Sequence, residues 1–404
     1  MSTTPLSLRE SPPAELSRRW AYPPAYLRIL GVQMAFGLSY SAFLLLPKYL
    51  RLELGASAQD IGAVAGAAVV AAAVLAPFIG LSARWVSRRL LVGFALVLAG
   101  LAGATFTLVP GLGPLMYLIR VLQGAAWIIV FQCTATMVAD LVPKERLSQA
   151  IGFLGVAMLA TNALAPAVVE PVADRFGWGI AFGVPGLLSL LCVLLVPGLP
   201  GAVATEPGPK TRSSFARPTV LPVHYGSLLM GCGIGVMFTF TQPYALSLGA
   251  TRVGDFFFGY VAMAMFVRLG LSNLADRVGP ARVATFSMIL YAVVVGSAAW
   301  LEPPLLVVLG LGLGACHGLM YPALMATGMA DLRPEERPVF MGWTSLAFNG
   351  GSAVTVLCLG PVADHYGYPV IFWTVGALIA TGILPLAITR GIIGKRHLRL
   401  DRLE

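Results

Sequence analysis

The chain has 404 residues, of which 57% are hydrophobic and only 11% are charged, and its mean hydropathy is +0.82. Because soluble domains are about 25% charged, this composition excludes an ordinary water-soluble protein and indicates a surface that faces lipid. The net charge of +9 would suit nucleic acid, but the placement of the basic residues, described below, explains it, and we expect no nucleic-acid partner.

The N-terminal residues 1–25 contain three arginines and several prolines but no apolar core. We therefore expect a cytoplasmic tail rather than a cleavable signal peptide, and a second cytoplasmic tail at 391–404. The five cysteines all lie in apolar stretches without a CxxC pair, so we expect buried free thiols.

Twelve apolar segments follow, each close to the ~20 residues that cross a bilayer as a helix. In chain order they are 26–50, 59–81, 89–110, 114–141, 147–171 and 178–198, and then 219–248, 254–275, 281–301, 304–331, 338–362 and 369–390. We predict an all-α integral membrane protein with two six-helix halves, 26–198 and 219–390, joined by a cytoplasmic linker at 199–218.

An internal repeat supports two related halves. Residues 137–146 contain an Asp, a Pro, a Glu and an Arg that recur 191 positions later, and residues 171–178 recur at 361–368. Internal repeats in membrane proteins are typical of transporters whose binding site lies between the repeats. We predict pseudo-symmetric halves and a small-molecule site between them.

The basic residues indicate the orientation. Of the 27 Lys and Arg residues, two lie within helices and four lie outside, and the others lie in the tails, the inner loops or the adjoining helix ends. The four outside residues are Lys48, Arg51, Arg175 and Arg252. Since Lys and Arg concentrate on the cytoplasmic side, we predict a multi-pass protein of the cytoplasmic (inner) membrane with both termini inside.

Two loops carry related charge patterns at equivalent places in the two halves. The loop after the eighth segment contains Asp276, Arg277 and Gly279 and follows Arg268. Its counterpart after the second segment contains Gly80, Arg84, Arg88 and Arg89. These loops resemble the Gly-x-Leu-Ala-Asp-Arg-x-Gly-Arg-Arg signature of the major facilitator superfamily, although Arg84 replaces its Asp and cannot act as the acidic partner.

Further motifs extend this resemblance over the whole chain. The run 120–124 resembles the family's Arg-x-x-Gln-Gly signature, and 165–166 resembles a weakened Gly-Pro motif. The runs 318–322 and 348–351 are similar to the efflux-type, sugar-efflux-like members. The resemblance implies a monomeric secondary transporter that exports a small organic solute by alternating access, with no cofactor. The alternatives are uptake, lipid or lysolipid transport, or a non-transporting sensor.

Arg120 is the deepest predicted charge. A charge within a spanning helix is costly and usually faces the bundle interior. The resemblance links Arg120 to coupling or substrate handling, whereas the alternative is that it binds carbonyl groups of a neighbouring helix. Other polar residues within helices are candidates to line a cavity, although each alone is more often a packing contact: Gln33, Tyr40, Gln123, Gln132, Gln242, Tyr244, His317, Tyr321 and Asn349.

Arg268 either lines the inner mouth or extends to the membrane surface. Acidic residues are absent from the middle of the predicted helices, so Arg120 and Arg268 should make the cavity positive. A positive, low-dielectric cavity repels cations, and we expect an anionic, zwitterionic or neutral substrate. Proton coupling would then depend on Asp60 or Glu170, near the outer helix ends. His317 has no acidic or His neighbour at helical spacing, and HExxH, GxSxG and GxxxxGK[ST] are missing. We therefore expect neither a metal nor an enzyme.

Overall fold

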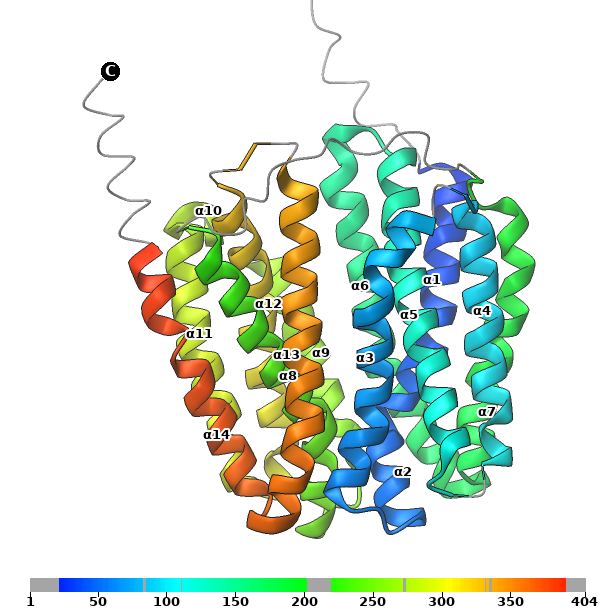
Figure 1. The fold of residues 1–404 in the computed structure, drawn as a ribbon, viewed down its shortest axis with the longest axis vertical. Coiled ribbons are helices and arrows are strands. Elements are labelled where there is room, and N and C mark those ends of the chain that lie inside the picture. The colour runs from blue at the N-terminus through cyan, green and yellow to red at the C-terminus, as the bar shows by residue number, and fades with distance from the viewer. Residues whose placement is uncertain are drawn as a thin grey trace, which may run out of the picture.

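The structure is a computed structural model, and it describes residues 22–82, 85–109, 111–201, 219–271, 274–330, 332–333 and 336–389. Long helices run roughly parallel to one another and form a bundle about one helix length tall (Figure 1). We call residues 22–201 the N-half and residues 219–389 the C-half.

The N-half consists of helices and short 3-10 segments. In order they are α1 (Pro24–Ala42), η2 (Phe43–Leu45), α2 (Leu46–Glu53), α3 (Ala58–Ser82), α4 (Arg88–Ala104), η3 (Thr105–Leu108), α5 (Pro114–Leu141), α6 (Lys144–Phe176), α7 (Trp178–Leu191) and η4 (Cys192–Gly198).

The C-half also consists of helices and short 3-10 segments. Its elements are α8 (Leu221–Ser247), α9 (Gly254–Gly270), α10 (Leu274–Val278), α11 (Pro280–Ser297), η5 (Ala298–Trp300), η6 (Pro303–Leu305), α12 (Leu306–Met329), α13 (Arg337–Tyr366) and α14 (Tyr368–Ala380), followed by a helical turn at 383–389.

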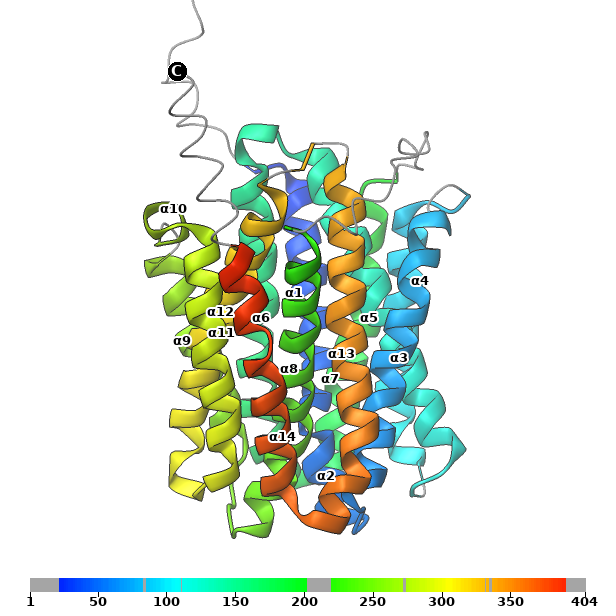
Figure 2. The ribbon, with the colours of Figure 1, turned by 60° about the vertical axis from the view of Figure 1, so that its left-hand side comes forward.

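Ten helical segments of the described chain are long and apolar enough to cross a membrane. The helices α4 and α9 are shorter, at 17 residues each, or about 26 Å, and lie alongside the others (Figures 1 and 2). Large apolar side chains such as Val74, Phe94 and Phe266 are exposed on the bundle. This surface fits lipid, and the predicted all-α membrane fold is confirmed.

Two helix ends differ from the prediction for one physical reason. We expected helices to end at 171 and 362, but α6 continues to Phe176 and α13 to Tyr366. Each continues past an internal proline and stops instead at a glycine, Gly177 or Gly367, with φ near +85°. Proline within a spanning helix is tolerated because neighbouring groups satisfy the freed carbonyl, whereas a left-handed residue ends the helix.

The two ends of the bundle are distinguished by the chain segments that reach them. The start of α1, the end of η4, the start of α8 and the turn 383–389 lie at one end, at the top of Figure 1. We call this the termini end and the opposite one the far end.

Four cysteines are buried as expected, but Cys358 is exposed on α13, so the expectation of five buried thiols is wrong at that position.

Candidate functional site: a far-end latch and a charged interior

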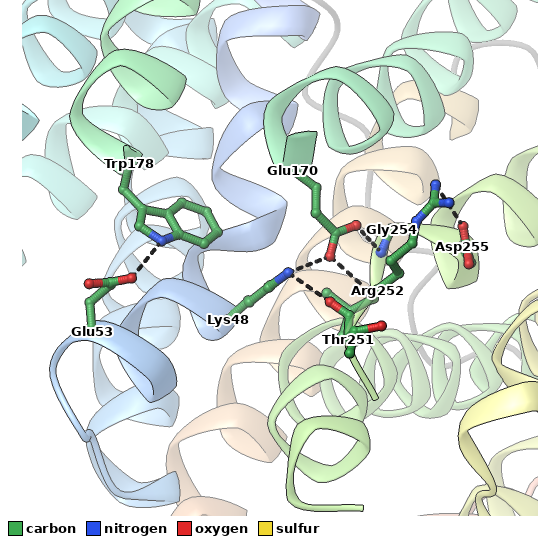
Figure 3. A network of polar contacts seen from close by, with 9 residues as sticks. Lys48, Glu53, Glu170, Trp178, Thr251, Arg252, Gly254 and Asp255 are labelled. Carbon is green, nitrogen blue, oxygen red and sulfur yellow. Dashed lines mark hydrogen bonds and ion pairs between the residues drawn. The ribbon is translucent and has the colours of Figure 1, made fainter. Parts of the chain in front are cut away.

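A buried ion pair lies at the far end. Lys48 of α2 donates to Glu170 Oε1 of α6 at 2.6 Å, and both side chains are almost fully buried. Glu170 also accepts from the backbone N–H groups of Val253 and Gly254, both at 2.9 Å, where α9 of the C-half begins. Lys48 reaches the same segment through the carbonyl oxygen of Thr251 at 3.1 Å (Figure 3). The pair therefore binds the N-half to the C-half.

A second carboxylate makes the reverse connection. Asp364, near the end of α13, accepts from the backbone N–H groups of Ala58 and Gln59, both at 2.8 Å, at the start of α3. The first N–H groups of a helix have no partner within the helix and carry its positive dipole end. Each half thus caps a helix of the other half with an acidic side chain.

The two caps occupy different positions of the internal repeat. Glu170 corresponds to Gly360 by the offset of 190 residues, and Asp364 corresponds to Asp174. A Cβ at Gly360 would lie 2.7 Å from the carbonyl oxygen of Ala58, so α13 packs directly on the start of α3. The C-half therefore approaches closely and uses a short Asp, whereas the N-half reaches across with a longer Glu.

Gln242 adds a third connection at the far end. Its Nε2 donates to the carbonyl oxygen of Leu44 at 2.7 Å and to that of Phe238 at 3.0 Å. We call Lys48, Glu170, Gln242 and Asp364 the far-end latch. Its buried charges are paired and hydrogen-bonded, which is the condition under which burial of charge is tolerated.

Arg120 lies inside the N-half, about 9 Å along α5 from its far-end start. It is buried; its Nε donates to the carbonyl oxygen of Val64 at 3.3 Å, and one Nη donates to Gln123 Oε1 at 2.5 Å. Within the described chain, no carboxylate pairs with Arg120. The carbonyl contact that was the alternative to a substrate role is present, and the guanidinium remains a net positive charge in the bundle.

Aromatic rings stack on one another inside the N-half. The half-buried Tyr40 of α1 stacks on Trp127 of α5, with ring centroids 4.6 Å apart, and Arg120 acts electrostatically on Tyr40. Trp127 also stacks with Phe36 and Phe131. The interior of the N-half therefore combines a cation with a stack of rings.

The C-half carries a second polar group of residues. Tyr260 Oη of α9 and His317 Nδ1 of α12 are hydrogen-bonded at 2.6 Å. Tyr321, one turn further along α12, is 42% exposed. Arg268 of α9 acts electrostatically on all three side chains, so the two halves each present one guanidinium together with phenol groups.

Other cavity candidates serve packing. Gln33 accepts from Thr134 and donates to Met158 Sδ, which ties α1 to α5 and α6. Tyr244 donates to the carbonyl oxygen of Ala299 inside the C-half. Two further candidates, Asn349 and Gln132, are half-buried. The side chain of Asn349 donates to the carbonyl oxygen of Ser345 in its own helix. The backbone carbonyl of Gln132 accepts from the hydroxyl of Thr136.

The loop motifs lie at the termini end. Arg88, at the start of α4, forms an ion pair with Asp140 at the end of α5, and Arg89 donates to the carbonyl oxygen of Pro197. Arg277 is exposed on α10, and Gly279 follows with φ +99°. Gly80 lies in α3, whereas Arg84 and the side chain of Asp276 lie outside the described residues.

The two acids considered for proton coupling differ in their surroundings. Asp60 accepts from the backbone N–H and the hydroxyl of Ser57, and Ser57 Oγ accepts from the N–H of Asp60. This is a capping box local to α3. Glu170 instead joins the halves. Sequence reasoning did not assign Lys48, Asp364, Trp127 and Tyr260 to the site. A signal existed for Lys48, a cation in an apolar stretch, and for Asp364, which lies in the repeated run 361–368.

The fold and this interior define a class: a helical membrane protein with charged groups enclosed between its two halves. The sequence profile described as the Major Facilitator Superfamily matches residues 29–327 and 245–392. The chain belongs to the Major Facilitator Superfamily, which confirms the resemblance found in the sequence.

Curated relatives agree with this family. The "Probable sugar efflux transporter" of Pasteurella multocida is 25% identical over 265 residues, which cover 62% of this chain and 64% of that protein, slightly less than two thirds of its length. The "Multi-drug resistance efflux pump PmrA" of Streptococcus pneumoniae is 25% identical over 364 residues, covering 82% of this chain and 87% of the pump. Because family and relatives are transporters, the chain is a transporter and not an enzyme.

Solved structures share the fold. The nucleoside transporter NupG aligns with a TM-score of 0.70 at 15% identity, covering 91% of this chain and 99% of NupG. A bacterial homologue of the human lysosomal transporter Spinster, in an inward-facing and unoccupied conformation, aligns with a TM-score of 0.69 at 15% identity, covering 90% and 96%.

Proposed function

We propose that this chain is a secondary transporter that exports a small organic solute across the cytoplasmic membrane by alternating access. We assign twelve spans to it, by adding α4 and α9 to the ten long apolar segments, in two pseudo-symmetric halves with both termini cytoplasmic. The names of the efflux relatives support the direction, and the distribution of basic residues supports the orientation.

The far-end latch is the observation that carries alternating access. Its hydrogen bonds connect α6 to α9 and α13 to α3 at one end of the bundle. These contacts exist only while the far end is closed, and an outward-open state requires that they break. A packed interface with two discrete arrangements is how rigid halves can rock about a central site.

The interior charge supports the substrate class. Arg120 is buried without a carboxylate partner in the described chain, and the stacked rings of Tyr40 and Trp127 belong to the same half. Buried charge attracts a counter-charge more strongly than in water. We infer an anionic, zwitterionic or neutral substrate that binds between the halves and stacks on these rings.

Glu170 is the group we propose for proton coupling. Protonation would remove its charge and thereby weaken its contacts with Lys48 and with the start of α9. A proton taken up at this position would favour opening of the far end. Asp60 is less suited, because its contacts remain within α3.

A dye-transport assay tests the proposal. Purified protein in liposomes is supplied with a cationic dye or an anionic dye, and transport is followed for wild type and Arg120→Ala. We expect transport of the anionic dye by wild type and its loss in the variant. Robust transport of the cationic dye by wild type, undiminished in Arg120→Ala, would contradict the substrate assignment.

A further inference from the structure

Arg268, in the last turn of α9, is a second and half-buried cation. Its Nε is buried without a hydrogen-bond acceptor, and within the described chain the side chain makes no ion pair. A buried guanidinium is normally neutralised by a carboxylate and satisfied by several acceptors. Arg268 therefore has unused donors and an unbalanced charge.

Arg268 faces the other half of the molecule. A Cβ built on Gly155 of α6 would lie 3.6 Å from an Nη atom of Arg268, so the guanidinium approaches the N-half across the boundary between α9 and α6. A cavity of about 140 Å³ borders the same side chain on the C-half side and is otherwise lined by apolar residues of α9 to α12. There is room beside Arg268 for a small group.

The neighbours of Arg268 can hold an anion but cannot neutralise the arginine. Tyr321 is partly exposed and has no hydrogen-bond partner in the described chain, so its hydroxyl is available as a donor. Tyr260 and His317 carry no carboxylate and are hydrogen-bonded to each other. Arg268 and Tyr321 thus provide donors for one acidic group.

The two arginines lie at different depths of the bundle. Arg268 is 14 residues from the far-end start of α9, and Arg120 is six residues from the far-end start of α5. At 1.5 Å per residue, their Cα atoms differ by about 12 Å along the axis. One guanidinium comes from each half, and neither is paired with a carboxylate in the described chain.

We propose that Arg268 and Tyr321 form a second acid-binding subsite, and that the substrate is an organic dianion whose two acidic groups bind Arg120 and Arg268. This inference rests on the proposed transport function. A molecule with two separated acidic groups neutralises both cations at once and contacts both halves. A monoanion leaves one guanidinium without a counter-charge.

Thermal unfolding of the purified full-length protein tests the subsite with linear dicarboxylates, from succinate to sebacate, as probes. Each is compared at equal ionic strength with the monocarboxylate of the same length. Because a ligand of the native state raises the Tm, we expect at least one dicarboxylate to raise it more than its monocarboxylate. Arg120→Gln and Arg268→Gln should each abolish this difference.

Two further variants keep the test decisive. Arg252→Gln removes an exposed arginine at the far end and should retain the difference. Tyr321→Phe removes one hydroxyl without a loss of charge and should weaken dicarboxylate binding about tenfold, the effect of one hydrogen bond to a charged group, so it remains informative if Arg268→Gln does not fold.

Three outcomes overturn the subsite: no dicarboxylate exceeds its monocarboxylate, Arg268→Gln or Tyr321→Phe binds as wild type does, or Arg252→Gln abolishes the difference. The assay measures binding only. If these outcomes occur while liposomes still transport the anionic dye, the dianion assignment fails and the transport function stands.

Discussion

Replacement of Glu170 by Gln should open the far end. The change removes the charge that neutralises Lys48, and an amide cannot accept from Val253 and Gly254 as a carboxylate does. Removal of one partner from a buried ion pair costs about 3–5 kcal/mol. Since Lys48 regains water when the halves separate, this cost falls on the closed state alone. The equilibrium should move toward the open far end by about a hundredfold to a few thousandfold.

The distance between spin labels measures this shift. Leu52 at the end of α2 and Leu248 after α8 are exposed and belong to different halves, and the exposed Cys358 is first replaced by Ser. We expect a longer distance to become dominant in Glu170→Gln.

The matched control for this measurement is Arg252→Met. The Arg252–Asp255 pair is separated by 3.5 Å and is largely exposed, and such surface pairs contribute about 0–1 kcal/mol. The control should therefore leave the distance distribution near that of wild type. An unchanged distribution in Glu170→Gln, or an equal change in the control, would refute the reasoning.

Three other predictions concern packing, thiols and topology. Gly124→Ala should lower stability by about 1–3 kcal/mol, because a methyl group there would overlap the backbone of Ala68 in α3; Gly152→Ala, which meets open space, serves as the control in thermal unfolding. A maleimide should label at most one thiol, Cys358, in the folded protein and the four buried thiols only after unfolding, as mass spectrometry would show. Cysteines placed in the 199–218 linker should resist an impermeant thiol reagent in intact cells, and ready labelling would reverse the proposed orientation.

The positions of the helices could be predicted because the membrane imposes them. A bilayer requires about 20 apolar residues per helix, and α5 was expected and found at 114–141. Gly177, which ends α6, was also visible in the sequence as a helix stop. The prolines before it, however, suggested an earlier end of the helix. Proline is a weaker stop inside a packed membrane helix than in water.

The far-end latch could not be predicted in this way. Glu170 and Val253 are 83 residues apart, and Asp364 and Ala58 are 306 apart, so their contacts depend on how whole helices are rotated and packed. Lys48 was counted as one of several outer charges, yet it is buried. Hydropathy gives the depth of a residue in the membrane but not which neighbour it faces.

Arg120 and Arg268 show an intermediate case. Their position inside helices was evident from the sequence, and so was the expectation that Arg120 faces inward. The unsatisfied Nε of Arg268 depends on which side chains of the neighbouring helices lie beside it in the described chain, and this is visible only when the neighbours are known.

The two acidic caps have a consequence for which substitutions the chain can accept. Glu170 and Asp364 accept hydrogen bonds from main-chain N–H groups. Every amino acid except proline has such an N–H group. Ala58, Gln59 and Val253 can therefore vary in side chain without loss of the hydrogen bond, provided that the new side chain fits. The groups that these acids bind at the starts of α3 and α9 are set by the geometry of the helix backbone and not by the side chains there. Homologous chains that close at this end should keep both acids and should have no proline at the starts of α3 and α9. They should not need a basic side chain on the opposite half that covaries with either acid.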